Sequence, residues 1–303
     1  MPYLSVVVLS YNTKKITKNC LNILYKSLNK FNNSSEIIII DNGSVDNSIQ
    51  MIKDFSKNKL SKKISIKTLF NKKNKGFSAA NNQGIKILKG KYVLFLNSDT
   101  IITNIDWEKL LHFFDRDRKI GVLTVKVLLP TGEIDPASHR GFPTLWNSFC
   151  YFIGLEKIFG KFPLIGKFFN GYHLSNLNTN EIHEVDSISG TFYLTKQSLL
   201  NRVGGFDSKH FFLYGEDLDL SYRIKELGYK IVYYPYYSVI HIKSVSGLKK
   251  DNLKIRRKTR KYFYDAMRAF YDKHYSEKYP RFINLLVHFF IELRSKNNEK
   301  NRD

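Results

Sequence analysis

The chain has 303 residues, 43% of them hydrophobic, and a formal net charge of +22. This length and composition exclude a small disulfide-stapled scaffold and indicate a globular protein, built as one large α/β domain with an appendage or as two small domains. The positive charge, much of it lysine scattered among asparagine, is compatible with nucleic acid, an anionic membrane surface or a phosphate-bearing substrate as partner.

The cysteines and the beginning of the chain bear on its compartment. Cys20 and Cys150 are too few for a disulfide framework, and we expect both to be buried, reduced thiols. The chain opens directly into a strand-like run, Leu4–Leu9, without the basic region and cleavage site of a signal peptide. No run reaches the roughly 20 apolar residues of a membrane span. We therefore expect a cytoplasmic protein, either free or peripheral on the cytoplasmic face of the membrane.

Strands and helices alternate along the first hundred residues. Short apolar, β-branched runs predict buried strands, and amphipathic spacing predicts the helices between them. The expected strands span 4–9, 36–41, 64–69 and 92–96, and the expected helices span 14–28 (with Thr13 as N-cap), 45–55 and 77–88. This alternation with short connections predicts an α/β fold with a Rossmann-like, mostly parallel, doubly wound sheet.

The fourth expected strand stops abruptly at Asn97-Ser98-Asp99. A carboxylate at the carboxyl end of a buried strand lies where open α/β sheets bind their ligands. Because carboxylate oxygen suits hard cations, Asp99 is a candidate ligand for Mg²⁺ or Mn²⁺. The alternative is that Asp99 only caps the following turn.

The second expected strand ends at Asp41, where a Rossmann enzyme keeps the acid that holds a ribose hydroxyl. No Gly-x-Gly-x-x-Gly follows the first strand, however, and the chain has no P-loop. A nucleotide diphosphate bound here needs another source of neutralising charge, which a divalent ion on Asp99 would supply. The sequence thus favours a nucleotide substrate that is consumed over a bound redox cofactor.

A glycine and small residues surround the start of the third expected helix. Gly76 allows a tight entry after Asn74, and the small residues before Asn81 let the first helical turn approach a ligand closely. An ordinary helix N-terminus is the alternative interpretation.

The regular pattern breaks between residues 133 and 184, after an expected strand at 121–129. Aromatic residues and glycines crowd this stretch without a clean period. A segment of this length and irregularity is usually functional or mobile, and we interpret it as an acceptor-side flap with His139 and Arg140 at its mouth. A satellite hydrophobic cluster is the alternative.

Order returns with an expected strand at 191–195 and a helix at 196–203, and Gly215 then introduces a helix that begins with Glu216, Asp217 and Asp219. We expect Leu218, Tyr222 and Leu227 to face the core of this helix, with Gly228 as its C-cap. The positive end of the helix dipole stabilises acidic groups, but a cap needs only one of them. Asp219 can share a face with Arg223, whereas Asp217 faces another way.

The last expected strands span 230–234 and 238–242, and the second contains His241. A lone histidine in a strand is usually structural. Residues 248–303 then form a basic amphipathic tail, with one helix before Pro280 and a nearly all-apolar segment after it, Phe282–Leu293. This segment is too short to span a bilayer but suits an anionic membrane surface; a core helix or a homodimer contact is the alternative.

Taken together, the ordered motifs resemble the family 2 glycosyltransferases of the GT-A fold, and most closely the bacterial rhamnosyltransferase-like branch. The resemblance covers Leu4 to Gly247, which we treat as one GT-A domain. Its motifs are, in chain order, Leu9-Ser10-Tyr11-Asn12, Asp41-Asn42-Gly43-Ser44, Asn74-Lys75-Gly76-Phe77, Leu96-Asn97-Ser98-Asp99, Ser189-Gly190 and Glu216-Asp217-Leu218-Asp219.

The resemblance implies roles for these residues. Asp41 would contact the nucleobase, Asp99 would bind a metal on the donor diphosphate, and Asp217 would be the catalytic base. His241 matches the place of a late histidine that completes the metal site in some relatives. Asn97 stands where many relatives carry the first acid of an Asp-x-Asp motif, and one carboxylate fewer should weaken metal binding. The residues expected to bind substrate are Ser10, Tyr11, Asn12, Asp41, Ser44, Asn74, Gly76, Asn81, Asn97, Ser98, Arg140, Gly190 and Glu216.

The implied activity is inverting transfer of a sugar from a nucleotide-diphosphate donor, a dTDP- or UDP-sugar with rhamnose among the candidates. The acceptor would be a hydroxyl of a cell-surface polysaccharide or a lipid-linked glycan. One alternative is a basic nucleic-acid-binding protein, which the scattered charge and the lack of a recognition motif oppose. Another is a catalytically inactive scaffold, which the intact Asp41, Asp99 and Asp217 oppose.

Overall fold

The computed structural model describes residues 1–59, 61–160, 162, 165–243 and 253–300. The boundary expected between residues 247 and 248 lies outside the described residues. Both cysteines are buried and free, as predicted. No helix in the described ranges combines the length and apolar character needed to cross a membrane.

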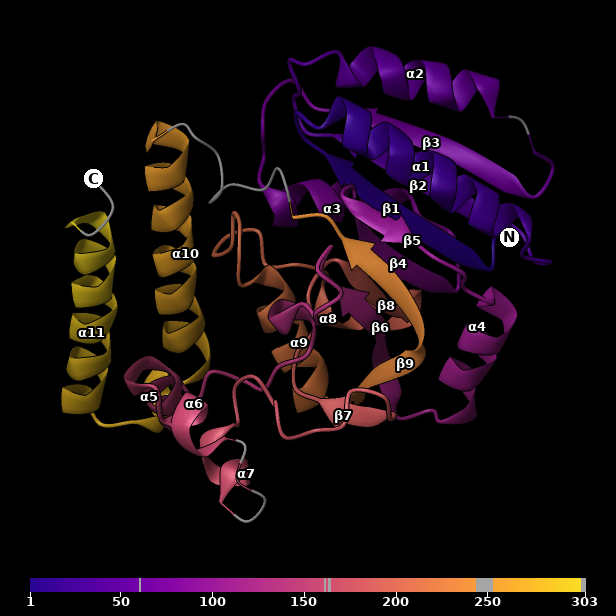
Figure 1. The fold of residues 1–303 in the computed structure, drawn as a ribbon. Coiled ribbons are helices and arrows are strands. Elements are labelled where there is room, and N and C mark those ends of the chain that lie inside the picture. The colour runs from indigo at the N-terminus through magenta and orange to yellow at the C-terminus, as the bar shows by residue number, and fades with distance from the viewer. Residues whose placement is uncertain (60, 161, 163–164, 244–252, 301–303) are drawn as a thin grey trace.

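A single mixed sheet forms the centre of the molecule (Figure 1). Its strand order is β3-β2-β1-β4-β8-β6-β9-β5, and β7 pairs with β9 at the side. Among the strands described, β1, β2, β3, β4, β6 and β9 run the same way and β5, β7 and β8 run against them. The prediction of a mostly parallel α/β sheet is therefore confirmed. The strands span Leu4–Ser10 (β1), Ser35–Asp41 (β2), Ile64–Phe70 (β3), Tyr92–Asn97 (β4), Thr100–Ile102 (β5), Ile120–Leu128 (β6), His183–Val185 (β7), Phe192–Lys196 (β8) and Lys230–His241 (β9).

Helices cover both faces of this sheet. The helices α1 (Lys14–Asn29), α2 (Ser48–Asn58) and α4 (Trp107–Arg116) pack on one face, and α3 (Phe77–Ile87), α8 (Gln197–Val203) and α9 (Glu216–Glu226) pack on the other. Central strands such as β2 are consequently buried on both sides, which explains the unbroken isoleucine run of β2.

Three details differ from the sequence-based predictions. The two strands expected at 230–234 and 238–242 are one strand, β9, because both halves pair with β6 across a bulge that accommodates Pro235. The helix expected from residue 45 begins at Ser48, after an Asp46 carboxylate that accepts the Ser48 N–H. Leu227, expected in the core, is 36% exposed at the C-cap of α9, and Gly228 follows it with φ +82°.

The irregular stretch from residue 133 to 184 contains short helices that its sequence does not reveal. They are the 3₁₀ turn η1 (Pro136–Ser138) and the α-helices α5 (Leu145–Ile153), α6 (Leu155–Phe159) and α7 (Gly166–Phe169). Many apolar side chains of this stretch are exposed, although some of its aromatic rings contact one another, as Phe159 and Phe169 do. The exposed ones include Trp146, Phe149, Ile153, Ile158, Phe162 and Phe168.

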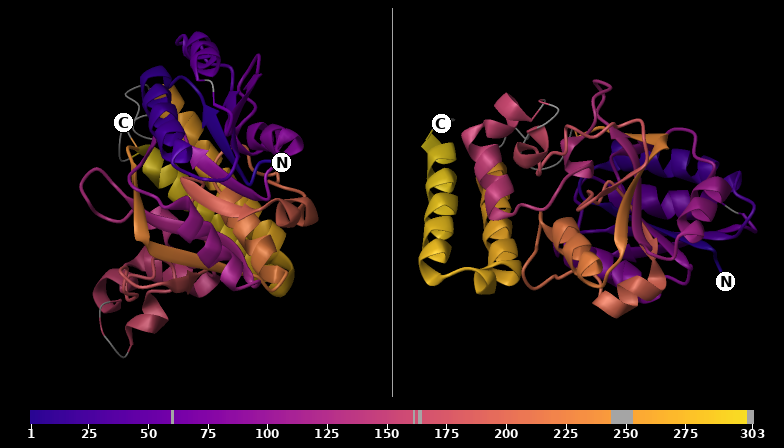
Figure 2. Two further views of the ribbon diagram at one scale, coloured as in Figure 1. Left: turned by 90° about the vertical axis from the view of Figure 1, so that its right-hand side faces the viewer. Right: turned by 90° about the horizontal axis from the view of Figure 1, so that it is seen from below.

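The C-terminal part forms a helical hairpin of α10 (Leu253–His274) and α11 (Arg281–Lys300), joined through η3 (Ser276–Lys278). Figure 2 shows the two helices side by side at one edge of the molecule. The helix α10 buries Ala266 and Phe270 against Leu218 and Tyr222 of α9. The expected tail is thus packed onto the helix that carries the acidic motif.

Candidate functional site

The carboxyl ends of β1 and β2 form the first part of the site around Asp41. This side chain is buried, and its Oδ1 accepts hydrogen bonds from the backbone N–H groups of Gly43 (3.1 Å) and Ser44 (2.9 Å). Its Oδ2 is also buried and has no hydrogen-bond partner among the described residues. A buried carboxylate oxygen without a donor costs free energy, so this atom suits a ligand that brings one.

Hydrogen bonds join the loop after β1 to the loop after β2. Asn12 has φ +52°, donates its N–H to Ser44 Oγ (2.8 Å) and accepts the Val45 N–H on its Oδ1 (2.8 Å). Ser10 is buried against Thr17, and Tyr11 is exposed beside them. The structure therefore brings Ser10, Tyr11, Asn12, Asp41 and Ser44 to one place, at the end of neighbouring parallel strands.

Asn74 and Gly76 join the same group through Asn42. The Asn42 side chain donates to Asn74 Oδ1 (3.0 Å) and to the Gly76 carbonyl (3.2 Å). Gly76 has φ +84°, and a Cβ there would lie 2.5 Å from the carbonyl oxygen of Phe212. The absence of a side chain at Gly76 therefore lets the backbone of Phe212 approach closely. Asn81 is buried and bonds to the Phe77 carbonyl.

Asp99 and His241 meet because β5 pairs with β9. Thr100 is the register partner of His241, so the residue before it is brought alongside that histidine. The Asp99 Oδ1 lies 3.3 Å from His241 Nε2, and both side chains are nearly buried. Burial alone would lower the pKa of His241, but the hydrogen bond to Asp135 and then the contact with Asp99 raise it to about 9.

The two residues before Asp99 are placed differently from it. Asn97 directs its amide toward Thr191 Oγ1 at 3.5 Å, and Ser98 is buried. The described residues contain no group of three His, Cys, Asp or Glu side chains arranged to hold a metal ion. Asp99 and His241 form a pair of nitrogen and oxygen donors, which fits a Mg²⁺ or Mn²⁺ ion that shares its other positions with water and diphosphate oxygens.

Asp217 lies in the first turn of α9, behind Gly215 at φ +78°. Its Oδ1 accepts from Arg140 Nη2 (3.0 Å) and from the Leu218 N–H (2.7 Å), and its Oδ2 accepts only from the Gly190 N–H (3.2 Å). The segment from 133 to 184 therefore contributes Arg140 directly to the acidic motif. Oδ2 retains lone-pair capacity for a further donor such as a hydroxyl group.

Glu216 is buried beside Asp217, and no group in the described part of the chain hydrogen-bonds to its Oε2. Burial, and then the neighbouring carboxylate of Asp217, raise the pKa of Glu216 well above its usual value. A carboxyl group in this position favours its neutral form.

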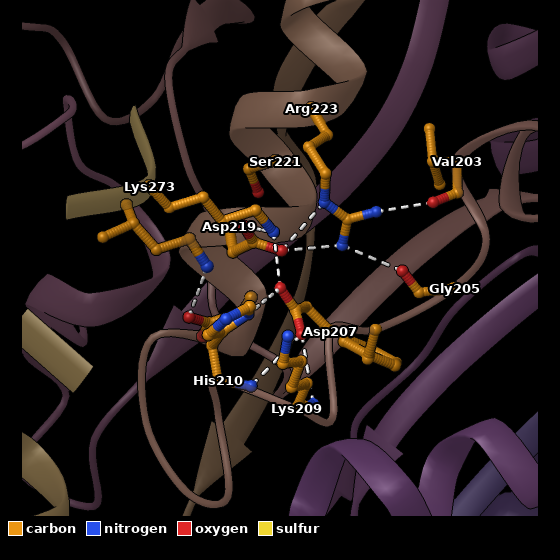
Figure 3. A network of polar contacts seen from close by, with 12 residues as sticks. Val203, Gly205, Asp207, Lys209, His210, Asp219, Ser221, Arg223 and Lys273 are labelled. Carbon is orange, nitrogen blue, oxygen red and sulfur yellow. Dashed lines mark hydrogen bonds and ion pairs between the residues drawn. The ribbon is translucent and has the colours of Figure 1, made fainter. Parts of the chain in front are cut away.

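Asp219 faces away from Asp217, as the sequence predicted, and is 0% exposed. Arg223 reaches it one turn along α9 through Nε (2.8 Å) and Nη2 (2.7 Å), and also bonds to the Val203 and Gly205 carbonyls (Figure 3). Lys273 and His274 approach the same carboxylate from α10, at 2.7 and 2.8 Å. This buried network joins the C-terminal hairpin to the acidic motif.

Sequence reasoning missed three contributors to the site. Asp135 and Lys243 were not predicted, although both belong to the surroundings of His241. Thr191 was expected only as a strand residue, yet its Oγ1 lies 3.3 Å from His241 Nδ1 while the preceding Gly190 contacts Asp217. The adjacent pair Gly190–Thr191 thereby connects Asp217 with His241, and no local sequence pattern signals this.

Known families match most of the chain. The model described as glycosyl transferase family 2 matches residues 5–214, and the one described as glycosyl transferase family group 2 matches residues 161–292.

Two curated proteins show similar sequences. A poly-beta-1,6-N-acetyl-D-glucosamine synthase of Staphylococcus epidermidis is 28% identical over 200 residues, which are 66% of this chain and 41% of the synthase. The chain thus spans about two fifths of the length of that relative. An N-acetylglucosaminyl-diphospho-decaprenol L-rhamnosyltransferase of Mycobacterium tuberculosis is 27% identical over 221 residues, which are 69% of this chain and 67% of that protein.

Solved structures share the fold at low identity. The mannosyltransferase PcManGT from Pyrobaculum calidifontis, in complex with GDP-Man and Mn²⁺, has a TM-score of 0.58 at 15% identity, covering 90% of this chain and 64% of that one. TarS 1-349 of S. aureus in complex with UDP-GlcNAc has a TM-score of 0.53 at 18% identity, covering 89% and 73%. At these identities the likeness shows a common GT-A architecture.

Proposed function

Because the chain belongs to glycosyl transferase family 2, we propose that it moves a sugar from a nucleotide-diphosphate donor to a hydroxyl group of a glycan or lipid-linked glycan, with inversion at the anomeric carbon. The observation that carries this proposal is the link through Gly190–Thr191. Gly190 contacts the candidate base, Asp217, and the next residue, Thr191, contacts His241 of the candidate diphosphate site.

The donor half of the proposal rests on the ends of β1, β2 and β4. The unpartnered Oδ2 of Asp41 suits an N–H donor of a nucleobase, and the fastened loops of Asn12 and Ser44 would surround it. We propose a dTDP- or UDP-sugar as donor, with rhamnose among the sugars, since one relative is named as a rhamnosyltransferase. That name also supports a lipid-linked acceptor, and the name of the glucosamine polymer synthase supports a polysaccharide.

Asp217 would perform the proton transfer of the reaction. Its Oδ2 would accept the proton of the acceptor hydroxyl as the hydroxyl oxygen attacks the anomeric carbon and the diphosphate leaves from the opposite side. Arg140 and the Leu218 N–H hold Oδ1, so they orient the carboxylate while leaving Oδ2 directed at the substrate. Glu216, favoured in its neutral form, adds no second full charge beside it.

Asp99 and His241 would hold a Mg²⁺ or Mn²⁺ ion at the donor diphosphate. Such an ion offsets the negative charge that develops on the leaving diphosphate. The structure of PcManGT with GDP-Man and Mn²⁺ supports a metal in this role for the fold. With Asn97 in place of an acid, the protein offers two ligands and relies on the donor itself for others.

The test of the proposal is an Asp217→Asn variant assayed with nucleotide sugars and a glycan acceptor. We expect turnover to fall by about 10²–10⁴-fold, the usual effect of losing a positioned general base, while donor affinity stays near that of the wild type. NMR of the product should show the anomeric configuration opposite to that of the donor. Near-normal turnover of the variant, or retained configuration in the product, would refute the mechanism.

We further propose that α11 places the enzyme on an anionic membrane surface, at the cytoplasmic face. Two polar residues of this helix turn toward α10: Asn284 bonds to Tyr271 Oη (2.6 Å) and His288 lies 3.0 Å from Asp272. Ile291 is buried, but six other apolar residues face outward and are 41–63% exposed. They are Phe282, Leu285, Leu286, Phe289, Phe290 and Leu293.

The basic ends of α11 support a lipid partner for this outward face. Exposed Arg281 begins the helix, and exposed Arg294 and Lys296 lie near its end. Arg294 also bonds to the Phe152 carbonyl of α5, which ties the hairpin to a stretch with its own exposed aromatic residues. An apolar helix face bordered by cations suits an anionic interface. A homodimer contact through the same face is the competing outcome.

A further inference from the structure

Asp135 is a buried carboxylate that neither the motifs nor the resemblance assigns to the site. It lies in the turn between β6 and η1, is 0% exposed, and caps η1 by accepting the Ala137 N–H on Oδ1 (3.0 Å). The same Oδ1 accepts from Lys243 Nζ (2.7 Å), while Oδ2 lies 2.8 Å from His241 Nδ1.

The two ring nitrogens of His241 face two different carboxylates. Nδ1 lies 2.8 Å from Asp135 Oδ2, so the ring can donate its Nδ1–H to that oxygen. Nε2 faces Asp99 Oδ1 at 3.3 Å. A histidine that donates one N–H to a carboxylate is fixed in orientation and tautomer, and its other nitrogen becomes the better metal ligand.

We propose that Asp135 is a positioning residue that holds His241 as a ligand of the divalent cation shared with Asp99. This inference rests on the metal site of the proposed function. Asp135 acts through the imidazole and does not touch the ion. Lys243 balances the buried charge of Asp135, so that the carboxylate stays available to the histidine when a cation replaces the proton on Nε2.

The competing explanation is that Asp135 only ties the end of β9 to the turn after β6. Loss of such a tie would lower stability without altering the affinity of the protein for metal. Asp135→Asn separates the two explanations, because the amide is isosteric with the carboxylate but lacks its charge. Asp135→Ala also removes the hydrogen bond to the ring.

The experiment measures binding of Mn²⁺ alone to the full chain, by the electron paramagnetic resonance signal of the free ion, alongside the thermal midpoint. We expect Mn²⁺ affinity to fall about 10–100-fold in Asp135→Asn, the usual effect of losing such a partner, and at least as far in Asp135→Ala. The control is Glu36→Gln, which removes another buried carboxylate paired with a lysine, Lys67, at 2.6 Å. It should lower the thermal midpoint and leave Mn²⁺ affinity unchanged.

The variants in this experiment distinguish a failure of the positioning role from a failure of the metal site. If His241→Ala and Asp99→Ala weaken Mn²⁺ binding and Asp135→Asn does not, the positioning role is refuted and the metal site stands. If the wild type does not bind Mn²⁺, or binds it equally well without His241, the metal site fails and the inference fails with it.

A measurement on the wild type covers the case in which the Asp135 variants do not fold. In protein labelled with ¹⁵N-histidine, Cd²⁺ should shift Nε2 of His241 as a coordinated nitrogen while Nδ1 stays protonated. Coordination through Nδ1, or no effect of Cd²⁺ on this ring, would overturn the proposal.

Discussion

Asp219→Asn should destabilise the protein more than it impairs the chemistry. The Asp219 carboxylate is fully buried and meets polar groups from two helices: the guanidinium of Arg223 on α9, and the ammonium of Lys273 and the imidazole of His274 on α10. The asparagine side chain carries no charge, and its NH₂ group would point toward one of the cationic side chains. The substitution thus removes the carboxylate that pairs with the partly buried Arg223, whereas Lys273 keeps its ion pair with Asp207. Asp217, on another face of the turn, keeps its contacts with Arg140 and Gly190.

The size of the effect follows from the burial of this network. Removing one partner of a buried ion pair costs about 3–5 kcal/mol. Unfolding entropy of about 2.1 cal/mol/K per residue, over 303 residues, amounts to about 0.64 kcal/mol/K. Dividing the cost by this entropy predicts a fall in the thermal midpoint of about 5–8 °C.

Differential scanning calorimetry of Asp219→Asn measures this shift directly. The matched control is Asp117→Asn, the same substitution in an exposed pair with Lys230, for which a much smaller shift of the thermal midpoint is expected. A double-mutant cycle with Lys273→Met should show coupling of about 0.5–3 kcal/mol, since both residues belong to one network. A shift no larger than that of the control, or no coupling, would show that Asp219 does not hold α10 against α9.

Two further predictions concern Glu216 and α11. The pKa of Glu216 in the native state is raised above its usual value of 4.5. Between these two pKa values the native state keeps a proton that the unfolded state releases. The free energy of unfolding therefore falls by about 1.4 kcal/mol for each pH unit of increase in this range. Glu216→Gln should remove this slope in urea unfolding from pH 4 to 8, and identical slopes would contradict the burial argument. Replacing Leu285 and Phe289 by serine should weaken binding to phosphatidylglycerol vesicles at least about tenfold, whereas Tyr236→Ser, another exposed aromatic on β9, should not. No vesicle binding by the wild type at low salt excludes the lipid, and a dimer abolished by the α11 changes would assign that face to self-association.

Local pattern was sufficient for most of the fold. The isoleucine run of β2 and the amphipathic spacing of α1 and α3 predict their elements to within a few residues, because burial on one or both faces leaves a periodic signature. The bulge at Pro235 is different. Pairing of β9 with β6 keeps the strand continuous across a residue that normally ends one, and only the partner strand determines this.

The site was predictable where its residues lie at strand or helix ends. Asp41, Asp99 and Asp217 stand out because a carboxylate directly follows a buried run or opens a helix. Their partners do not share that property. Asp135 lies in an ordinary turn, and its contact with His241 joins positions 106 residues apart, so its significance depends on strand order alone.

The same limit applies to the C-terminal hairpin, whose amphipathic pattern does not reveal which surface each helix packs against. The apolar face of α10 buries Phe270 and His274 against α9, because Asp219 and Tyr222 offer both charge and ring contacts there. In α11 the polar stripe of Asn284 and His288 is satisfied by α10, which leaves the apolar face outward. One carboxylate, Asp219, therefore connects the proposed membrane-facing hairpin to the helix turn that presents Asp217. Under the proposed membrane role of α11, an acceptor held at the lipid surface would meet a base whose helix, α9, is joined to the hairpin through Asp219.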